Sequence, residues 1–547
     1  MIDNHTPTPT PSNLPIRARV YKYGLGNVRS YQHLAPLPPK MTTPAYIPLE
    51  RFPEIRAELK STFASGRTKV IPWRQRQLLQ LARLVQENAD AIAEAVHKDL
   101  GKPRFEIYLA ETGPVVERSI ICAKKVAEWA KDEDKSGEVD DWMKGWKPTV
   151  RKEPKGVALI IAPWNYPVIL SLQPLYGAIA AGCCAVIKPS EIAPSYSRLL
   201  AELVPKYLDN DAFRVVEGAV PEITRLLELQ WDHIFYTGNG RVARVISAAA
   251  ARHLTPLTLE LGGKNPVIID PAADVDLAAK RIIYGKSQNA GQICVSPDYV
   301  LCPKSVLDQF VKLLNDHAKS FWPESTLKSS SFGRIVSNAH FSRLTSILQS
   351  TRAKVISGGG RDFEGKIDPA GRPRGLELTI FLLEREHWDD DALMSEWVNA
   401  RISAGPALTR SRELFGPFLP ILPVEDINEA IGFVSARDHP LVLYAFCSSD
   451  KNKDKILHNT MSGNAVFNDT FQQLAVNELP FGGVGESGYG RQVLRYSFDI
   501  FTYERTVIDI PNEMDQALGI RYPPYTQDKF DILSGPTKMP IPKLEDL

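Results

Sequence analysis

Segments that look like strands alternate with segments that look like helices between residues 157 and 261, and this alternation constrains the fold most strongly. The strand-like segments, such as VALII and HIFYT, are continuously apolar. Strands that are apolar on both faces belong to a parallel sheet with helices on both sides. Apolar residues also recur at helical spacing from Gln75 to His97, which predicts one amphipathic helix there. We therefore expect an α/β fold with strands at 157–161, 185–187, 213–216, 233–237 and 256–261, and helices at 168–181, about 196–208 and from about 238.

The composition excludes several classes of protein. Lysine plus arginine (65) balances aspartate plus glutamate (64), so the net charge of +1 gives no sign of a nucleic-acid partner. The six cysteines lack the spacing of a disulfide framework or a zinc site, which indicates a reducing compartment and no metal. The uncharged stretch 156–187 contains three prolines, so we expect no transmembrane segment. A chain of 547 residues is too long for one core, which predicts two or three domains.

The two ends of the chain look like appendages. Residues 1–40 hold seven prolines and five basic residues but only one acid, which predicts a disordered leader. A transit peptide is the alternative, although the prolines argue against an amphipathic targeting helix. We expect a cytoplasmic protein, and the basic leader leaves a mitochondrial or membrane-peripheral location as the alternative. Residues 511–547 are expected to form a C-terminal tail on the surface.

Two polar motifs follow strands, at the edge where parallel sheets bind ligands. KPSE (188–191) follows one strand, and the pattern Gly238-x-Gly240-x-x-Ala243 follows another. The second motif fits a dinucleotide-binding turn, in which a helix N-terminus offers its N–H groups to a pyrophosphate. A plain tight turn fits the pattern equally well. Glu260 follows at about 20 residues, which is the spacing expected of a ribose ligand.

Three residues are candidates for catalysis, and each has an ordinary alternative. Cys294 lies among small and polar residues in GQICVSP, which suits a nucleophile, although a buried structural thiol is the commoner case. Glu260 ends an apolar strand beside two glycines, where burial would raise its pKa toward that of a general base. Asn165 in the rigid turn APWNYP suits an oxyanion donor, or it simply forms the turn.

Taken together and in order, these motifs resemble the aldehyde dehydrogenase superfamily. The stretches LTPLTLELGGKNP, SPDYVLC and RYPPYT look most like its class 3 or fatty-aldehyde branch. The resemblance implies a Rossmann-type cofactor domain, an α/β catalytic domain and a small β oligomerisation arm. The matching stretches span about residues 50 to 510 and are APWNYP, KPSE, YTGNGRVARVI, TLELGGKNP, GQICVSPDYVLC, ELFGPFLPI and LPFGGVGESGYG.

The resemblance also implies roles for individual residues. Cys294 would attack the aldehyde as a thiolate, and Asn165 and the Cys294 backbone N–H would hold the oxyanion. Glu260 would activate the hydrolytic water, which makes it a base and not a ribose ligand. The cofactor would be NAD, with NADP possible if Glu191 swings away from a 2′-phosphate. The residues implied in cofactor binding are Lys188, Glu191, Thr237, Gly238, Asn239, Gly240, Val242, Gly262, Glu413 and Phe415.

The same resemblance implies the domain limits and the reaction. Residues 41–260 form the NAD-binding domain, to which the chain returns near 424–470, and residues 261–423 form the catalytic domain. Residues 135–155 and 470–510 form the oligomerisation arm of a homodimer. The implied reaction oxidises an aldehyde to the carboxylic acid with NAD(P)+, through a cysteine thiohemiacetal and thioester. The aldehyde is expected to be apolar: long-chain, aromatic or apocarotenoid.

One departure from the family pattern bears on activity. About sixteen extra residues (397–412) separate ALMSE from ELFGP, two motifs that the family joins almost directly. We interpret this insert as an unspliced intron in the gene model, and a real loop over the cofactor mouth is the alternative. Three other functions are considered: a catalytically impaired family member, a CoA-acylating relative and a Cys–His hydrolase. The base at Glu260 disfavours the CoA-acylating relative.

Overall fold

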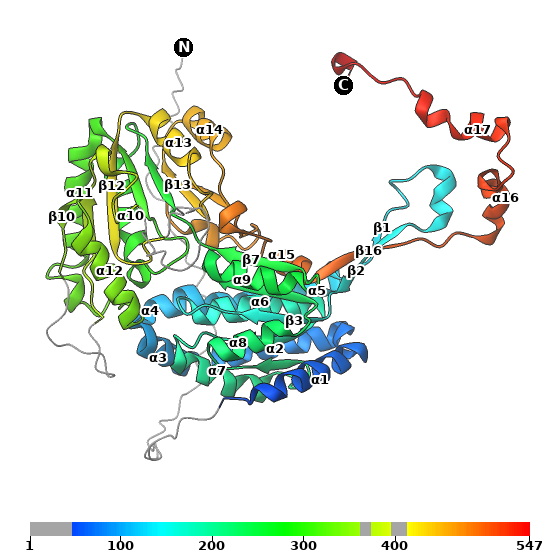
Figure 1. The fold of residues 1–547 in the computed structure, drawn as a ribbon, viewed down its shortest axis with the longest axis horizontal. Coiled ribbons are helices and arrows are strands. Elements are labelled where there is room, and N and C mark those ends of the chain that lie inside the picture. The colour runs from blue at the N-terminus through cyan, green and yellow to red at the C-terminus, as the bar shows by residue number, and fades with distance from the viewer. Residues whose placement is uncertain (1–45, 361–373, 395–412, 547) are drawn as a thin grey trace, which may run out of the picture. The chain divides into compact units, whose positions relative to one another are not determined.

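Three sheets organise the described part of the chain, which comprises residues 46–360, 374–394 and 413–546 of the computed structural model (Figure 1). Two of the sheets are largely parallel, and the third is small and antiparallel. The predicted α/β fold is therefore confirmed. The leader predicted over 1–40 and the insert predicted over 397–412 lie outside the described residues.

The first sheet contains all five strands predicted between residues 157 and 261, and they run parallel as expected. Its order is β15-β7-β6-β3-β4-β5, so the strand order reverses between β3 and β6, as in a Rossmann-type sheet. β15 is a short edge strand that pairs antiparallel with β7. The strands are β3 (Val157–Ile161), β4 (Cys184–Lys188), β5 (Phe213–Val215), β6 (His233–Gly238), β7 (Leu257–Leu261) and β15 (Gly488–Tyr489).

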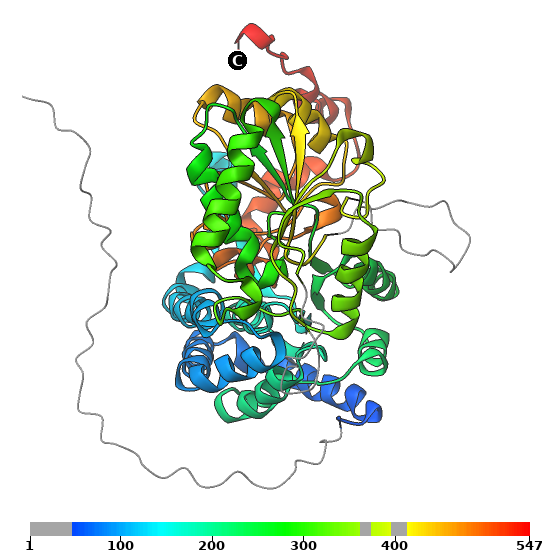
Figure 2. The ribbon, with the colours of Figure 1, turned by 90° about the vertical axis from the view of Figure 1, so that its left-hand side faces the viewer.

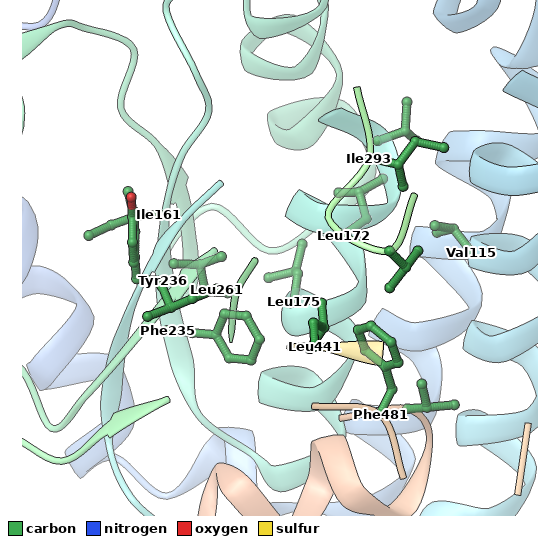
Figure 3. Packing of buried hydrophobic residues seen from close by; sticks show 14 of the residues in the cluster. Val115, Ile161, Leu172, Leu175, Phe235, Tyr236, Leu261, Ile293, Leu441 and Phe481 are labelled. Atoms are coloured by element: carbon green, nitrogen blue, oxygen red, sulfur yellow. The ribbon is translucent and has the colours of Figure 1, made fainter. Parts of the chain in front are cut away.

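Crossover helices cover the first sheet. α6 joins β3 to β4 and packs on both, and α9 joins β6 to β7 and packs on both. Figure 3 shows Leu172 and Leu175 of α6 among Phe235 and Leu261 of the sheet and Val115 of α5. The crossover helices are α6 (Pro167–Ala181), α7 (Pro194–Tyr207), α8 (Val220–Glu228) and α9 (Gly240–Ala251).

The helix predicted from Gln75 to His97 proves to be two helices. α2 ends at Glu87 and α3 begins at Ala89, because Asn88 leaves the helical region at φ −116° and ψ 18°. The apolar spacing continues across the break, so periodicity alone did not reveal it. α2 and α5 pack on each other and on α6. The N-terminal helices are α1 (Phe52–Ala64), α2 (Ile71–Glu87), α3 (Ala89–Leu100), α4 (Arg104–Ile107) and α5 (Gly113–Trp129).

The second sheet has the order β10-β11-β12-β9-β8-β13-β14, and its neighbours are parallel except β10 and β11. β13 and β14 lie within residues 424–470, and β13 pairs with β8. The predicted return of this segment to the cofactor domain is therefore wrong, because buried apolar strands of two parallel sheets look alike in sequence. The strands are β8 (Pro266–Ile269), β9 (Tyr299–Pro303), β10 (Lys354–Ser357), β11 (Thr379–Leu382), β12 (Phe418–Val424), β13 (Val442–Phe446) and β14 (Asn464–Phe467).

Helices lie on both sides of the second sheet, as the green and yellow elements of Figure 2 show. A small cluster of buried apolar side chains, which includes Tyr299, Trp388 and Phe433, joins the sheet to α13. A much larger cluster runs through the first sheet and into the second. The helices are α10 (Val275–Ser287), α11 (Leu307–Phe321), α12 (Asn338–Ser350), α13 (Ile427–Ser435) and α14 (Asp450–Asn459).

The third sheet has the order β1-β2-β16 and joins the two segments predicted to form the arm. None of residues 508–546 is buried, so the predicted C-terminal tail contributes nothing to the core. No helix among the described residues is long and apolar enough to cross a membrane. The elements are β1 (Glu133–Asp134), β2 (Thr149–Pro154), β16 (Thr502–Val507), α15 (Arg495–Ile500), α16 (Asp515–Leu518) and α17 (Gln527–Leu533).

Candidate active site

The loops after the strands of the first sheet face a loop that precedes a strand of the second, and the candidate site lies where they meet. Asn165 lies in the turn after β3, and Cys294 lies in the loop before β9. The side-chain amide of Asn165 donates to the main-chain oxygen of Gln292, with Nδ2 and oxygen 3.1 Å apart. Two predicted catalytic residues from distant parts of the chain are thus brought together.

Buried side chains fix the main chain on both sides of Cys294. Asn265 Nδ2 donates to the carbonyl oxygens of Cys294, at 2.7 Å, and of Ser296, at 3.0 Å. The Tyr444 hydroxyl donates to the carbonyl oxygen of Val295, at 2.7 Å. The loop therefore holds the half-buried thiol in one place.

The Cys294 thiol lies in surroundings that favour its protonated form. Burial raises its pKa well above the ordinary value, and the carboxylates of Glu260 and Glu413 raise it further. The N–H groups of Cys294 and Val295 act in the opposite direction and lower the pKa. A thiol in these surroundings needs a base to become a nucleophilic thiolate.

Glu260 offers such a base. Its main chain lies in β7, where it pairs with Thr237 of β6 and Gly488 of β15. The side chain is buried, and neither carboxylate oxygen has a hydrogen-bond partner among the described residues. Burial raises the pKa of Glu260 to about 8. A carboxyl group that has no hydrogen-bond partner and a pKa near neutrality is suited to general-base catalysis.

The residues that follow β6 form a cradle at the N-terminus of α9. Asn239 caps the helix, because its Oδ1 accepts a hydrogen bond from the N–H of Val242 at 3.0 Å. An added Cβ at Gly238 would overlap a neighbouring tyrosine hydroxyl, and α9 begins at Gly240. The hydroxyl of Thr237 is buried and has no partner among the described residues. Such a helix start offers free N–H groups to an anion.

Lys188 and Glu191 lie at the end of β4, on the other side of β3 from β6. The Lys188 Nζ atom lies 2.7 Å from Glu191 Oε2, and the lysine is buried while the Glu191 side chain is 36% exposed. The strand order reverses between β3 and β6, and Rossmann-type sheets bind dinucleotides at such a switch point. Both predicted cofactor motifs therefore border the expected binding edge.

Gly262, Glu413 and Phe415 lie beside the catalytic candidates. An added Cβ at Gly262 would overlap the Glu413 carboxylate, so only glycine leaves room for it. The rings of Phe415 and Trp164 are 5.4 Å apart, edge to face, which places Phe415 next to the turn that carries Asn165. The predicted site residues thus lie along one edge of the first sheet and in two loops that face it.

Comparisons with known proteins agree on one family. The model described as "Aldehyde dehydrogenase family" matches residues 50–370 and 405–507. "Aldehyde dehydrogenase, dimeric NADP-preferring" of Canis lupus familiaris is 38% identical over 476 residues, which are 87% of this chain and 98% of that protein. "Aldehyde dehydrogenase family 3 member A2" of Rattus norvegicus is 38% identical over 471 residues, 86% of this chain and 91% of that protein. The structure described as "Substrate bound state of Staphylococcus Aureus AldH" has a TM-score of 0.78 at 35% identity, covering 89% and 99%.

The chain belongs to the aldehyde dehydrogenase family. It is an NAD(P)-dependent oxidoreductase that converts aldehydes to carboxylic acids. The resemblance to aldehyde dehydrogenases that the sequence motifs indicated is therefore confirmed. Family membership also decides against the Cys–His hydrolase considered above. Among the described residues, no group of three or more metal-ligating side chains is arranged to hold an ion.

The edge of the first sheet fits the cofactor of an aldehyde dehydrogenase. The Thr237 hydroxyl, which has no partner among the described residues, and the N–H groups at the start of α9 are of the kind that suits a pyrophosphate. Lys188 provides a cation at the end of β4, which β3 separates from β6. The missing side chain of Gly262 lets the Glu413 carboxylate lie directly against this edge. These features agree with binding of a dinucleotide across the switch point.

Four residues of this aldehyde dehydrogenase site were not predicted from the sequence. The His340 ring of α12 lies 5.0 Å from the Trp164 ring, and Arg343, one turn later, donates to the carbonyl oxygen of Leu414. Lys102 and Asn289 both donate to the main-chain oxygen of Asn165. Lys102, His340 and Arg343 lie in no recognisable motif, and Asn289 lies two residues before the GQICVSP stretch. The helical spacing of three between His340 and Arg343 is the sole signal that marks one pair as neighbours.

Proposed function

We propose that this aldehyde dehydrogenase works through a covalent intermediate on Cys294, with Asn165 as oxyanion donor and Glu260 as base. The observation that carries the proposal is the buried Glu260 carboxylate, which interacts electrostatically with the Cys294 thiol and has no hydrogen-bond partner among the described residues. A carboxylate in this state is suited to take a proton first from the thiol and later from water. The Asn165 amide beside the same loop supports the third role.

The first step forms a carbon–sulfur bond. Glu260 accepts the thiol proton, and the Cys294 sulfur attacks the carbonyl carbon of the aldehyde. The carbonyl oxygen becomes an oxyanion, which Asn165 Nδ2 and the N–H of Cys294 hold. One such donor is worth about 3 kcal/mol of barrier. The Asn165 amide has two N–H groups, so one can donate to the oxyanion while the other stays on the Gln292 carbonyl oxygen, 3.1 Å from Nδ2.

NAD(P)+, when bound, would supply the hydride acceptor: loss of hydride from the carbon bonded to the Cys294 sulfur would give NAD(P)H and leave a thioester on Cys294. Glu260 releases its first proton to solvent and then takes a proton from a water molecule whose oxygen attacks the thioester carbon. The carbon–sulfur bond breaks, the carboxylic acid leaves, and Cys294 is restored. The residues proposed to hold the cofactor are Lys188 and Glu191 for the adenosine ribose, Thr237, Gly238, Asn239, Gly240 and Val242 for the pyrophosphate, and Gly262, Glu413 and Phe415 for the nicotinamide half.

The proposed substrate is an apolar aldehyde, either long-chain, aromatic or apocarotenoid. Trp164 and Tyr166 flank Asn165 in the turn, and both rings pack partly buried against the large core cluster, which supports an apolar approach to the thiol. Each methylene that the site buries is worth about 0.8 kcal/mol, or roughly a fourfold gain in kcat/KM. A series of aliphatic aldehydes should show this gain, and a flat series would contradict the apolar site.

We propose that NAD is preferred and that NADP is accepted when Glu191 swings away. The pair between Lys188 Nζ and Glu191 Oε2, 2.7 Å apart, supports this, because a 2′-phosphate would meet the carboxylate. The dog relative, by contrast, is named NADP-preferring. Glu191→Gln should raise kcat/KM for NADP relative to NAD, and an unchanged ratio would remove Glu191 from the choice.

Assembly, domain limits and location complete the proposal. We propose a cytoplasmic homodimer that pairs through the arm segments 135–155 and 470–510, with domains at 41–260 and 261–423. The dog relative is named dimeric, which supports the assembly.

Fluorescent fusions of the full chain and of a form without residues 1–40 test the compartment. Sequencing the transcript tests whether residues 397–412 are a retained intron.

The decisive experiment measures NADH formation over a panel of aldehydes, without and with free CoA. We expect activity without CoA, and an absolute CoA requirement would favour the acylating alternative. Cys294→Ser should abolish hydride transfer, and intact transfer in this variant would contradict the covalent mechanism. Glu260→Gln should slow acid release. Titration with NADH, followed by nicotinamide fluorescence, separates a catalytically impaired protein that cannot bind cofactor from an active one.

A further inference from the structure

A buried ion pair lies beneath the turn that carries Asn165. The side chains of Lys102 and Glu111 are both fully buried, and Lys102 Nζ lies 2.7 Å from Glu111 Oε1. Burying two charges is costly unless the pair is well placed and its remaining hydrogen-bonding capacity is used. Lys102 Nζ also donates to the Asn165 carbonyl oxygen, at 2.9 Å, and lies 3.5 Å from the centre of the Tyr166 ring. The pair is therefore attached to the catalytic turn itself.

A second buried side chain reaches the same carbonyl. Asn289 Nδ2 donates to the Asn165 oxygen at 3.0 Å and to the Gln292 oxygen at 3.1 Å. The main chain at Asn289 is in the left-handed region, with φ 48°, which a non-glycine residue adopts only when its surroundings enforce it. The surroundings here include Glu106, whose Oε2 accepts from the Asn289 N–H at 2.8 Å. Strain of this kind concentrates at functional sites.

We propose that Lys102 and Asn289 are positioning residues that clamp the main-chain carbonyl of Asn165 and so hold its side-chain amide in place for the oxyanion. The inference rests on the proposed function, because it takes Asn165 as the oxyanion donor. Two donors hold the Asn165 carbonyl, and the hydrogen bond from Nδ2 to the Gln292 oxygen restricts the rotation of the Asn165 side chain. An oxyanion donor contributes when it is already in place before charge develops, and small misplacements are costly.

The clamp also explains why both carboxylate oxygens of Glu111 are engaged. Glu111 Oε1 holds Lys102, and Glu111 Oε2 accepts from the N–H of Val168 at 2.9 Å, in the first turn of α6. One carboxylate thus links the lysine to the helix that follows the catalytic turn. The Asn165 carbonyl and the start of α6 are thus tied to the same pair of charges, and Asn289 ties the turn to the loop of Cys294.

Two sets of variants separate the clamp from general stability. Asn289→Gly removes only the side-chain amide, because glycine accepts a φ of 48° readily and keeps the N–H that Glu106 binds. Lys102→Met with Glu111→Gln removes the ammonium together with the charge of its Glu111 partner, and the glutamine oxygen can still accept from Val168. Glu111→Gln alone is the control for the charge pair: it keeps the contact between Lys102 and Asn165, and thermal unfolding measures the cost of leaving the buried ammonium without its carboxylate. Thermal unfolding and NADH titration check the fold and the cofactor site of each variant.

The readout is a double-mutant cycle on kcat for NADH formation with Asn165→Ala. Alone, Asn165→Ala should lower kcat by about 10²–10³. Asn289→Gly and the Lys102→Met/Glu111→Gln pair should each lower kcat by about 10–100-fold with KM nearly unchanged, as expected for a displaced catalytic group. In the Asn165→Ala background the same substitutions should cost less than about twofold, because residues that act through one partner are not additive.

The outcomes distinguish the inference from the function beneath it. Costs that multiply in the Asn165→Ala background, or an unchanged kcat in a folded Asn289→Gly variant, overturn the clamp while the proposed mechanism stands. An unchanged kcat in Asn165→Ala overturns the oxyanion role and the clamp together. Loss of kcat in the control Glu111→Gln equal to that of the double variant would assign the effect to the charge pair and not to the contact with Asn165, and would also overturn the clamp.

Discussion

The single carboxylate of Glu260 sets the expected pH response of the site. Its pKa is about 8 because burial disfavours the charged form, with no other cause of comparable size. A base acts only when deprotonated, so the fraction of active enzyme rises with pH and levels off above that pKa. The burial that destabilises the carboxylate also makes it basic enough to take a proton from a thiol whose own pKa is raised.

We therefore predict that kcat for NADH formation increases from pH 6 toward a plateau above about pH 8 in the wild type. Glu260→Gln should lower kcat by about 10²–10⁴, the usual contribution of a general base. The same variant should also lose the step in the pH profile. Steady-state rates in buffers of constant ionic strength measure both effects. A Glu260→Gln profile that keeps the wild-type step would assign the titration to another group.

At Gly262, the missing side chain is the functional feature. An added Cβ would overlap the Glu413 carboxylate, so Gly262→Ala should displace Glu413. We predict that the KM for NAD rises about tenfold, which corresponds to a loss of about 1.4 kcal/mol of binding free energy. Gly432→Ala is the control, because an added Cβ there meets no atom and alanine favours the α13 helix. Equal KM values for the two variants would show that Glu413 does not contact the cofactor.

Helix α9 is the element on which cofactor binding is expected to depend most. Its first turn carries the Asn239 cap, and its N–H groups point toward the end of β6. Aspartate caps a helix as well as asparagine does, but its charge repels a phosphate at the same site. We predict that Asn239→Asp leaves the melting temperature nearly unchanged and weakens NADH binding by about tenfold or more. Fluorescence titration at low and high salt checks this, and unaltered binding would remove α9 from the pyrophosphate site.

The elements also show what sequence reasoning can and cannot predict here. The strands from 157 to 261 were predicted within a residue or two, because continuous apolar runs between turns have one structural meaning. The pairing of β13 with β8 was not predicted, because the apolar sequence of a buried strand does not show which sheet the strand joins. The break at Asn88 was missed because the apolar spacing runs through it. Local patterns fix elements, and only tertiary contacts fix which elements meet.

The candidate site is a property of the whole molecule for the same reason. Cys294, Glu260 and Asn165 could be picked from their motifs, since each motif combines glycine or proline turns with one reactive or polar side chain. Lys102 and His340 could not, because each reaches the site through packing between distant helices and loops. Motifs mark residues that touch the reaction, whereas the residues that hold them in place are distributed through the fold.

The exposed edge of the β1-β2-β16 sheet is the part of the molecule through which we expect two copies of the chain to form a dimer. β16 is an edge strand among the described residues, and it exposes Tyr503 and Val507 at 48% and 38%. An exposed edge strand is a template for pairing with another chain, and a lysine placed at one of its apolar positions disfavours pairing. We predict that the wild type sediments as a dimer and that Val507→Lys shifts it toward monomer. Val355→Lys, on the edge strand β10 and 44% exposed, is the matched control and should remain dimeric. Sedimentation velocity over a range of concentrations decides, and equal behaviour of the two variants would place the dimer contact elsewhere.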